Sequence, residues 1–532
     1  MKKKLAMIFA ACLMLSLTAC GNQAAEETQE QETEADGQET VDEEATLVIP
    51  STSDIESLNY LQVGLSDNGE TMLGAVYDPL YRVMQDGSIK YYLAESAEMN
   101  EEMTELVIKL KDGIKWHDGE TLDTDDVMYT FNALQSGTLV SGFSVGTTLN
   151  GEPVSIEKVD NLTVKLTLPA PSASYLNMFG GFHPLPEHRY ADLADPNTDE
   201  ENQVGIGNGP YKVKEHIPGE KLVLERNDDY YRGKAHFAEV EYKIIPETTS
   251  QEIALQNGEI NFFKVSDQQT LEKYKADENY SVAVSVEGRI NYLGLNKNSE
   301  VMSDIKAREA VVKALDIEEI VAGVYGSDEI ATACPGGVIC AGGQYYDESL
   351  PNYEQDVEEA QKLAEESGLT DKTVRLLYNT ARAGMEDIAL IIQQQCQEAG
   401  INVELVGMDS GAMLADFFDG NATSWDIGLN GFTSGGNPVY ARSFFTTTGY
   451  YAANAYVTEE VDECWLKADT LPTEEERQEA FAELNTELQK CYSFVPISST
   501  NRIIVTQKDY KGFEGVDGTN PLNDYLELYK VQ

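Results

Sequence analysis

Basic residues are scarce in this chain of 532 residues. Lysine and arginine together number 38, against 92 aspartates and glutamates, and the formal net charge at pH 7 is −54. Binding to nucleic acids or to the anionic surface of a membrane depends on a surplus of cations, so this composition argues strongly against both. The same charge makes copies of the chain repel one another, and we expect a soluble monomer.

Histidine is also rare, and none of the five histidines stands in a His-Glu-x-x-His or Cys-His context. Those patterns are typical of hydrolases, so a secreted hydrolase is the least favoured function. His117 is interpreted as a turn residue. The pair His183 and His188 would be able to present metal ligands, but the prolines between them favour a structural loop. We expect no catalytic residue, no resident metal and no cofactor.

Only seven cysteines are present, and two of them, Cys12 and Cys20, lie in the first twenty residues. The other five are an odd number, which leaves at least one thiol unpaired or intermolecular. Cys334 and Cys340 fit no zinc pattern, but they are near enough in sequence to close a small loop. We predict a disulfide between them, which would stabilise the fold by roughly 2–3 kcal/mol.

An apolar run from Leu5 to Leu17 follows three lysines at the N-terminus. It is too short to be a stable membrane span, and a basic start before a short apolar run is typical of a secretory signal. The run ends in Leu17-Thr18-Ala19-Cys20, which resembles the bacterial lipobox, in which the cysteine is lipidated and becomes residue one after cleavage. We therefore predict a lipoprotein signal peptide over residues 1–20, with Cys20 as the membrane anchor.

Residues 21–45 contain ten acidic residues and no basic ones. Like charges repel along such a segment, and it holds too few apolar side chains to pack. The segment is predicted to be a disordered acidic tether that keeps the folded body away from the membrane.

The stretch from Leu106 to Leu134 has a clear local pattern. Apolar residues alternate with others over residues 106–110, which favours a strand with one buried face. Two Asp-Gly turns follow, and Asp123 with Asp126 forms a capping-box-like pair at the start of a predicted helix.

As a string, this stretch resembles the signature T-F-x-L-R-x-G-V-K-F-H-D-G-x-P-x-T-A-x-D-V of the family 5 solute-binding proteins of ABC transporters, the group of oligopeptide, dipeptide and nickel binders. Lys111 stands where that family usually has arginine. Residues 207–211 match a second family pattern, G-T-G-P-Y, and residues 222–231 are close to L-x-R-N-x-x-Y-W. The resemblance runs from about Thr46 to the C-terminus. The residues that match the first signature are Leu110, Gly113, Lys115, His117, Asp118, Gly119, Asp126 and Val127.

The resemblance implies an α/β fold like that of type II periplasmic binding proteins, with two lobes around a ligand cleft plus an inserted small α/β domain. The length of the chain independently requires two or three domains. A β-α-β order over residues 374–406 predicts two parallel strands with a right-handed crossover. We predict lobe I over residues 46–76, 206–290 and 500–532, the inserted domain over residues 77–205, and lobe III over residues 291–499.

The ligand site is expected in the segment 426–438. Peptide binders of the family carry G-W-x-x-D followed by D-P or E-P there, and the aspartate pairs with the α-amino group of the peptide. Here Phe432 replaces the tryptophan, Gly435 stands near the aspartate position and Asn437 precedes the proline. This departure puts recognition of the α-amine in doubt, although an extended peptide added to the strand would still bind through its main chain. The predicted ligand-binding residues are Ser53, Tyr378, Arg382, Asn430, Gly431, Phe432, Thr433 and Asn437, with Arg382 meeting a ligand carboxylate.

These patterns together favour an extracytoplasmic substrate-binding lipoprotein of an ABC importer, on the outer face of the cytoplasmic membrane. It would capture oligopeptides by closure of its lobes and deliver them to the permease subunits. A binding protein for oligosaccharides, stacked on Phe432, or for nickel or a metallophore remains the alternative.

Overall fold

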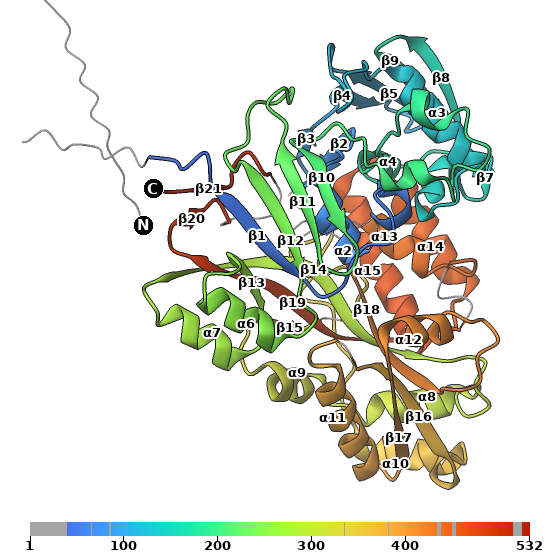
Figure 1. Cartoon of the computed structure of the whole chain (residues 1–532). Coiled ribbons are helices and arrows are strands. Elements are labelled where there is room, and N and C mark those ends of the chain that lie inside the picture. The colour runs from blue at the N-terminus through green and yellow to red at the C-terminus, as the bar shows by residue number, and fades with distance from the viewer. Residues whose placement is uncertain are drawn as a thin grey trace, which may run out of the picture. The chain divides into compact units, whose positions relative to one another are not determined.

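The computed structural model describes residues 40–532 except residues 65, 85–86, 335, 381, 434–437, 450–453 and 514–523. The predicted signal peptide, Cys20 and Asn437 therefore lie outside the described residues. Residues 41–532 form one compact unit (Figure 1). The predicted tether extends too far toward the C-terminus, because residues 41–45 belong to the folded part: Val41 pairs with Val531 and Ala45 is buried.

A first sheet of four strands has the order β1-β12-β11-β10. β1 and β12 are parallel, and the other neighbours are antiparallel. Two short helices follow β1, and a hairpin, β2 and β3, leads out of this part of the chain. The strands are β1 (Thr46–Ser51), β10 (Tyr211–Ile217), β11 (Lys221–Arg226), β12 (Glu239–Ile244), β2 (Tyr81–Val83) and β3 (Ile89–Tyr91), and the helices are α1 (Tyr60–Val63) and α2 (Asp67–Leu73).

A second antiparallel sheet, in the order β4-β5-β9-β8, lies within residues 77–205. The predicted strand over residues 106–110 is β5, and β8 and β9 form an antiparallel hairpin. The capping box of Asp123 and Asp126 is confirmed at the start of α3. The elements are β4 (Ala94–Met99), β5 (Glu105–Leu110), α3 (Thr124–Gln135), η1 (Gly142–Thr147), β6 (Thr148–Leu149), β7 (Glu152–Pro153), β8 (Ser155–Asp160), β9 (Thr163–Thr167), α4 (Tyr175–Gly180), α5 (Glu187–Tyr190) and η2 (Glu200–Gln203).

The segments around His117 and Gly207, which carry the first and second family patterns, contact each other where the chain returns to the first sheet. A Cβ on Gly207 would lie 1.9 Å from the carbonyl oxygen of Val76, so only glycine fits there. The amide of His117 donates to the carbonyl of Gly207 at 2.8 Å, and Nε2 of His117 lies 3.1 Å from the carbonyl oxygen of Gly209. Burial lowers the pKa of His117 to about 4, which keeps the ring neutral. His117 is therefore a structural residue.

A third sheet has the order β13-β19-β14-β18-β16-β17, with β15 on β19. The predicted parallel pair is confirmed as β16 and β17, joined by α11. The strands are β13 (Phe262–Val265), β14 (Tyr280–Leu295), β15 (Ala331–Ala333), β16 (Thr373–Asn379), β17 (Asn402–Met408), β18 (Ile427–Thr433) and β19 (Phe494–Gln507). The shortest pair, β20 (Tyr510–Lys511) and β21 (Tyr529–Lys530), follows near the C-terminus.

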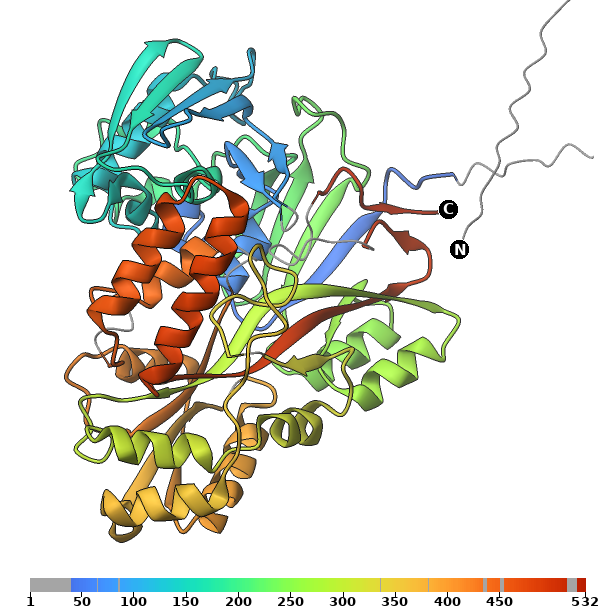
Figure 2. The ribbon, with the colours of Figure 1, turned by 180° about the vertical axis from the view of Figure 1, so that it is seen from behind.

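Helices cover this third sheet, and Figure 2 shows them from behind. α14 and α15 pack against each other in the part of the chain just before β19. The helices are α6 (Thr248–Gln256), α7 (Gln268–Lys275), α8 (Ile305–Lys313), α9 (Ile317–Tyr325), α10 (Val357–Glu366), η3 (Leu369–Asp371), α11 (Met385–Glu398), α12 (Ser410–Phe417), α13 (Pro438–Phe444), α14 (Glu459–Thr470) and α15 (Glu474–Lys490).

Three apolar clusters form the interior. The first joins the first sheet to the inserted sheet, so residues 77–205 share a core with lobe I. The second lies under α6–α11, and the third holds the aromatic side chains around Phe432 and α13–α15. The predicted boundaries of lobe III fall inside the two long strands β14 and β19, where Ile290 pairs with Ser499 and Asn291 with Ser498.

A candidate ligand site where β14 and β19 cross between the lobes

β14 and β19 carry an unusual set of buried polar side chains at the predicted lobe boundary. The ladder between them is irregular from Val286 to Arg289, and Gly288 has φ +69° in the bulge. Such a bulge bends a strand and re-aims the side chains beside it. We call the set around it the polar stripe; it consists of Glu287, Arg289 and Asn291 of β14 with Ser498, Thr500 and Arg502 of β19, all buried except the partly exposed Thr500.

Glu287 is the acidic centre of the polar stripe. Its carboxylate lies 2.5 Å from the ammonium group of Lys264 and accepts a hydrogen bond from the hydroxyl of Thr500 at 2.6 Å. Burial alone favours the neutral acid, but Lys264, Arg502 and Arg289 outweigh it and hold the pKa of Glu287 at about 2. The carboxylate therefore stays charged at any physiological pH.

Asn291 holds the other end of the polar stripe together. Its amide nitrogen donates to the hydroxyl of Tyr325 at 3.3 Å and to that of Ser498 at 3.1 Å, and its amide oxygen accepts from Nε of Arg289 at 3.1 Å. A Cβ on Gly431 would lie 2.4 Å from Nη2 of Arg289. Gly431 is one of the predicted ligand-binding residues, and in the structure its missing side chain leaves room for the guanidinium of Arg289.

One edge of β18 lies open beside the polar stripe. β18 pairs with β14 over its whole length, from Ile427 to Thr433, but with β16 only at Ile427 and Gly428. Beyond Gly428, the described residues give β18 no second strand neighbour. The half-buried Asn430 and Thr433 lie in this open segment. Because β16 and β18 are parallel, the opening is at the carboxyl ends of their strands, where open α/β sheets bind ligands.

The loop after β16 lies next to this opening. A Cβ on Gly384 would lie 3.5 Å from the hydroxyl of Tyr325, which in turn contacts Asn291. The half-buried Arg382 lies two residues before Gly384 on this loop. Tyr378 offers little surface to a ligand, because it is 7% exposed and its ring lies over Gly407 of β17.

The prediction that Phe432 lines the cleft is contradicted by its burial. Its side chain is 6% exposed, and its ring packs with the rings of Tyr292, Phe444 and Phe445 at centroid distances of 6.1, 5.6 and 5.7 Å. Phe432 pairs with Ile290 and therefore faces the side of the sheet opposite to Gly431 and Arg289. Protein atoms occupy the ring surface on which a sugar would stack.

Ser53 stands apart from these residues. It is exposed in the bend after β1, and its hydroxyl accepts a hydrogen bond from the side chain of Asn68. Among the described contacts, none joins Ser53 to β18 or to the polar stripe. Its role in ligand binding stays a prediction.

The predicted disulfide is not formed in the structure. Cys334 and Cys340 are both buried thiols. Burial raises the pKa of the Cys334 thiol well above its ordinary value, and the thiolate needed for disulfide exchange is correspondingly disfavoured.

The described helices include none that is both long and apolar enough to cross a membrane.

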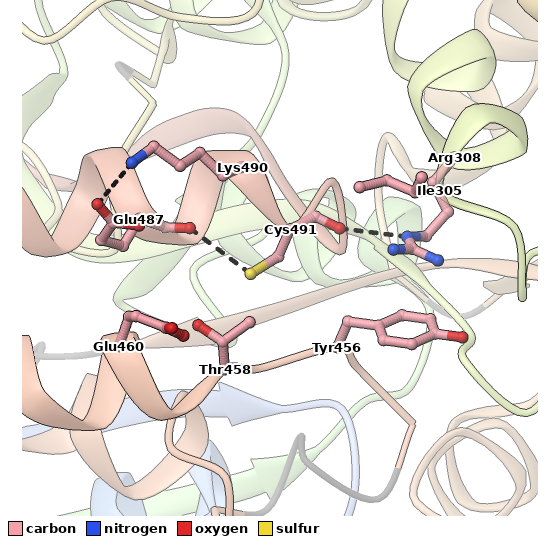
Figure 3. Close-up of a pocket in the computed structure, with 8 residues that line it drawn as sticks. All are labelled: Ile305, Arg308, Tyr456, Thr458, Glu460, Glu487, Lys490 and Cys491. Carbon is pink, nitrogen blue, oxygen red and sulfur yellow. Dashed lines mark hydrogen bonds and ion pairs between the residues drawn. The ribbon is translucent and has the colours of Figure 1, made fainter.

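A cavity of about 260 Å³ lies elsewhere, between α8 and α15 (Figure 3). Arg308 lines this cavity, and its guanidinium lies 3.7 Å from the ring centre of Tyr456. The same guanidinium donates to the main-chain oxygens of Cys491 and Met302 at 3.2 and 3.0 Å. Its hydrogen-bonding capacity is directed to the protein, so this cavity is a weaker candidate than the open edge of β18.

One serine pattern of hydrolases does occur in the chain. Gly142-Phe143-Ser144-Val145-Gly146 matches the G-x-S-x-G string of nucleophile elbows, which place the serine between a strand and a helix. Here the five residues lie in the 3-10 helix η1 and lead into β6. The context required for that nucleophile is not met.

Sequence reasoning missed the polar stripe, although a signal for it was present. Glu287, Arg289 and Asn291 alternate along a stretch that is otherwise rich in apolar residues. Charged residues at every second position of a buried strand indicate a polar surface on one face. Their partners on β19 lie about two hundred positions away, for example 207 between Asn291 and Ser498, and no local pattern reveals them.

Separate apolar clusters connected by the long paired strands β14 and β19, with an open strand edge on β18 beside them, are typical of a bilobal binding protein of the α/β class. The sequence matches the family described as bacterial extracellular solute-binding proteins, family 5, over residues 88–452. The chain belongs to this family, and its fold is the two-lobed type II architecture with an inserted domain that the sequence predicted.

Three relatives illustrate the similarity. The oligopeptide-binding protein AppA of Bacillus subtilis is 28% identical over 448 residues, which are 80% of each chain. The crystal structure of the ABC transporter substrate-binding protein CtaP of Listeria monocytogenes has a TM-score of 0.82 and 30% identity, and the match covers 92% of this chain and 100% of that one. The structure of Bacillus subtilis AppA with a nonapeptide has a TM-score of 0.82 and 23% identity, over 93% and 100% of the chains, and supports the fold alone.

Proposed function

We propose that this protein is the substrate-binding lipoprotein of an ABC importer, and that it captures oligopeptides by adding them as a strand to the open edge of β18. The observation that carries the proposal is the segment Leu429–Thr433, which pairs with β14 on one side and has no strand partner on its other side among the described residues. A strand edge binds a peptide through main-chain hydrogen bonds and needs little from particular side chains. This explains how the protein can bind peptides without the acidic residue of the family pattern. The names of AppA and CtaP support the class of ligand and the transporter.

Closure of the two lobes around the ligand is part of this proposal. With the predicted lobe boundaries, the chain passes between lobe I and lobe III within β14 and β19, and the irregular ladder at Val286 to Arg289 lies next to the boundary in β14. A hinge needs residues that can change their backbone angles without breaking an apolar core. In this proposal Arg382, on the loop after β16, meets the carboxylate of the peptide.

The location follows from the sequence of the N-terminus. The apolar run and Leu17-Thr18-Ala19-Cys20 support lipidation of Cys20, and acidic residues 21–40 would act as the tether. A diacyl or triacyl anchor holds a protein stably at a membrane, whereas a single chain does so only marginally. The anchored monomer would deliver its peptide to the permease subunits.

The ligand class can be tested by calorimetry on protein from which ligand has been removed by denaturation and refolding. We expect heat of binding with a mixture of oligopeptides and none with oligosaccharides or with nickel–histidine complexes. A peptide identified in this way should then be compared with copies methylated at single main-chain nitrogens. Loss of about tenfold or more in affinity at alternate positions is expected, because a strand bonds its neighbour through every second residue.

The opposite results are equally informative. Binding of sugars or nickel complexes alone would replace the peptide proposal by the corresponding alternative. Peptide binding that tolerates methylation at every position would keep the ligand class but exclude strand addition.

A further inference from the structure

Asp469, near the end of α14, accepts an array of hydrogen bonds. Its carboxylate accepts from the hydroxyl of Ser172 at 2.8 Å, from the amide of Ser174 at 2.8 Å and from Nη1 of Arg442 at 2.8 Å. Its main-chain oxygen accepts from the amide of Ala173 at 2.8 Å. Arg442 also donates to the side chain of Asn150. We call these contacts the clasp.

The clasp joins two parts of the chain that have separate interiors. Ser172, Ala173 and Ser174 belong to the inserted domain, whose apolar residues pack with those of lobe I. Asp469 follows Ala468, which belongs to the third apolar cluster of lobe III. In both views the helices α14 and α15 lie beside the inserted domain (Figures 1 and 2). The clasp is therefore a contact between the two halves that β14 and β19 connect.

The chemistry of the clasp suits a contact that opens and closes. Asp469 and Ser172 are 6% and 0% exposed, so both are desolvated while the contact is made. Each donor and acceptor can be satisfied by water when the contact opens, and the net free energy of such an exchange is small. A permanent interface between parts of one core would bury apolar side chains instead.

We propose that Asp469 is a positioning residue, which stabilises the closed arrangement of the lobes through the clasp and so sets ligand affinity without contact with the ligand. The proposal rests on the proposed function, because closure is useful only if a ligand is enclosed. A residue of this kind changes the fraction of protein in the binding-competent state. It therefore changes every dissociation constant by the same factor.

The direct test compares Asp469→Asn with the wild type in the full mature chain. The asparagine keeps one acceptor but turns its amide NH2 group toward at least one of the three donors in either orientation. We expect the dissociation constants of at least three different peptides to rise by a common factor of about tenfold, mainly through faster dissociation. The amides of Ala173 and Ser174 should exchange their hydrogens faster in the liganded variant than in the liganded wild type.

Ser172→Ala provides a second variant on the other side of the clasp. It should show the same common factor at smaller size, and the double variant should lose less than the product of the two effects. Glu483→Gln is the matched control, because it breaks an exposed ion pair with Lys467 between α14 and α15 inside lobe III. Its affinities should equal those of the wild type.

Unchanged affinity and exchange in Asp469→Asn would overturn the proposal, and so would a loss confined to one peptide, which would indicate direct ligand contact. If the wild type binds no peptide, the proposed function fails instead. In that case the clasp is tested by exchange of the same two amides in the ligand-free protein, where equal rates in wild type and variant would overturn it.

Discussion

Replacement of Gly431 by alanine tests the geometry of the polar stripe. The added Cβ would lie 2.4 Å from Nη2 of Arg289 and 2.6 Å from the amide oxygen of Asn291. Both side chains are buried and bonded to each other, so neither can move away freely. Overpacking of this kind costs about 1–3 kcal/mol. We expect the free energy of unfolding to fall by that amount.

The assay is urea denaturation followed by tryptophan fluorescence. Trp425 and Trp465 lie in the same lobe as Gly431, whereas Trp116 lies in the inserted domain, so the lobes can be followed separately by single-tryptophan variants. Gly146→Ala is the control, because nothing lies within 4 Å of its added Cβ. In an Arg289→Ala background the penalty of Gly431→Ala should shrink, because the closer of the two obstacles is gone. An unchanged stability in Gly431→Ala would refute the placement of Arg289.

Four further predictions follow from individual side chains. Phe432→Ala should lower the free energy of unfolding by about 3–5 kcal/mol, as expected for a buried aromatic ring. The folded fraction should bind ligand with an affinity within about threefold of that of the wild type. A large loss of affinity without loss of stability would show that Phe432 contacts the ligand. Denatured, unreduced protein without the lipid should show five reactive thiols, and a count of three would show that two of the cysteines form a disulfide. Folding lowers the pKa of His117 from its ordinary value of 6.5 to about 4, so the stability linked to its neutral form is present above pH 6.5 and is lost as the pH falls toward 4. Between pH 7 and pH 4, His117→Gln should therefore lose about 3 kcal/mol less stability than the wild type. Parallel curves of stability against pH would contradict the assignment. Cys20→Ala should release the protein from the membrane fraction, and unchanged retention would show that the anchor lies elsewhere.

Local features of the fold were predictable from the sequence because their causes lie within a few residues. The capping box of Asp123 and Asp126 is one case, and the parallel pair β16 and β17 with its connecting helix is another. The family landmark at residues 207–211 also has a local requirement, since only glycine fits beside the carbonyl of Val76.

The candidate site was less predictable because its parts meet only in the folded chain. Gly431 and Phe432 are neighbours, yet they lie on opposite faces of β18, one under Arg289 and the other in an aromatic cluster. The choice between these faces depends on pairing with β14, which is more than one hundred positions earlier. The clasp depends in the same way on Ser172 and Asp469, which are 297 positions apart.

Hydrogen exchange of β18 is the most direct test of strand addition. The amides of residues 429–433 should be compared in ligand-free protein and in protein saturated with a bound oligopeptide. We predict slower exchange in this segment on binding, because the peptide supplies the acceptors that its open edge lacks among the described residues. Protection confined to the cavity between α8 and α15, with no change at residues 429–433, would contradict the account.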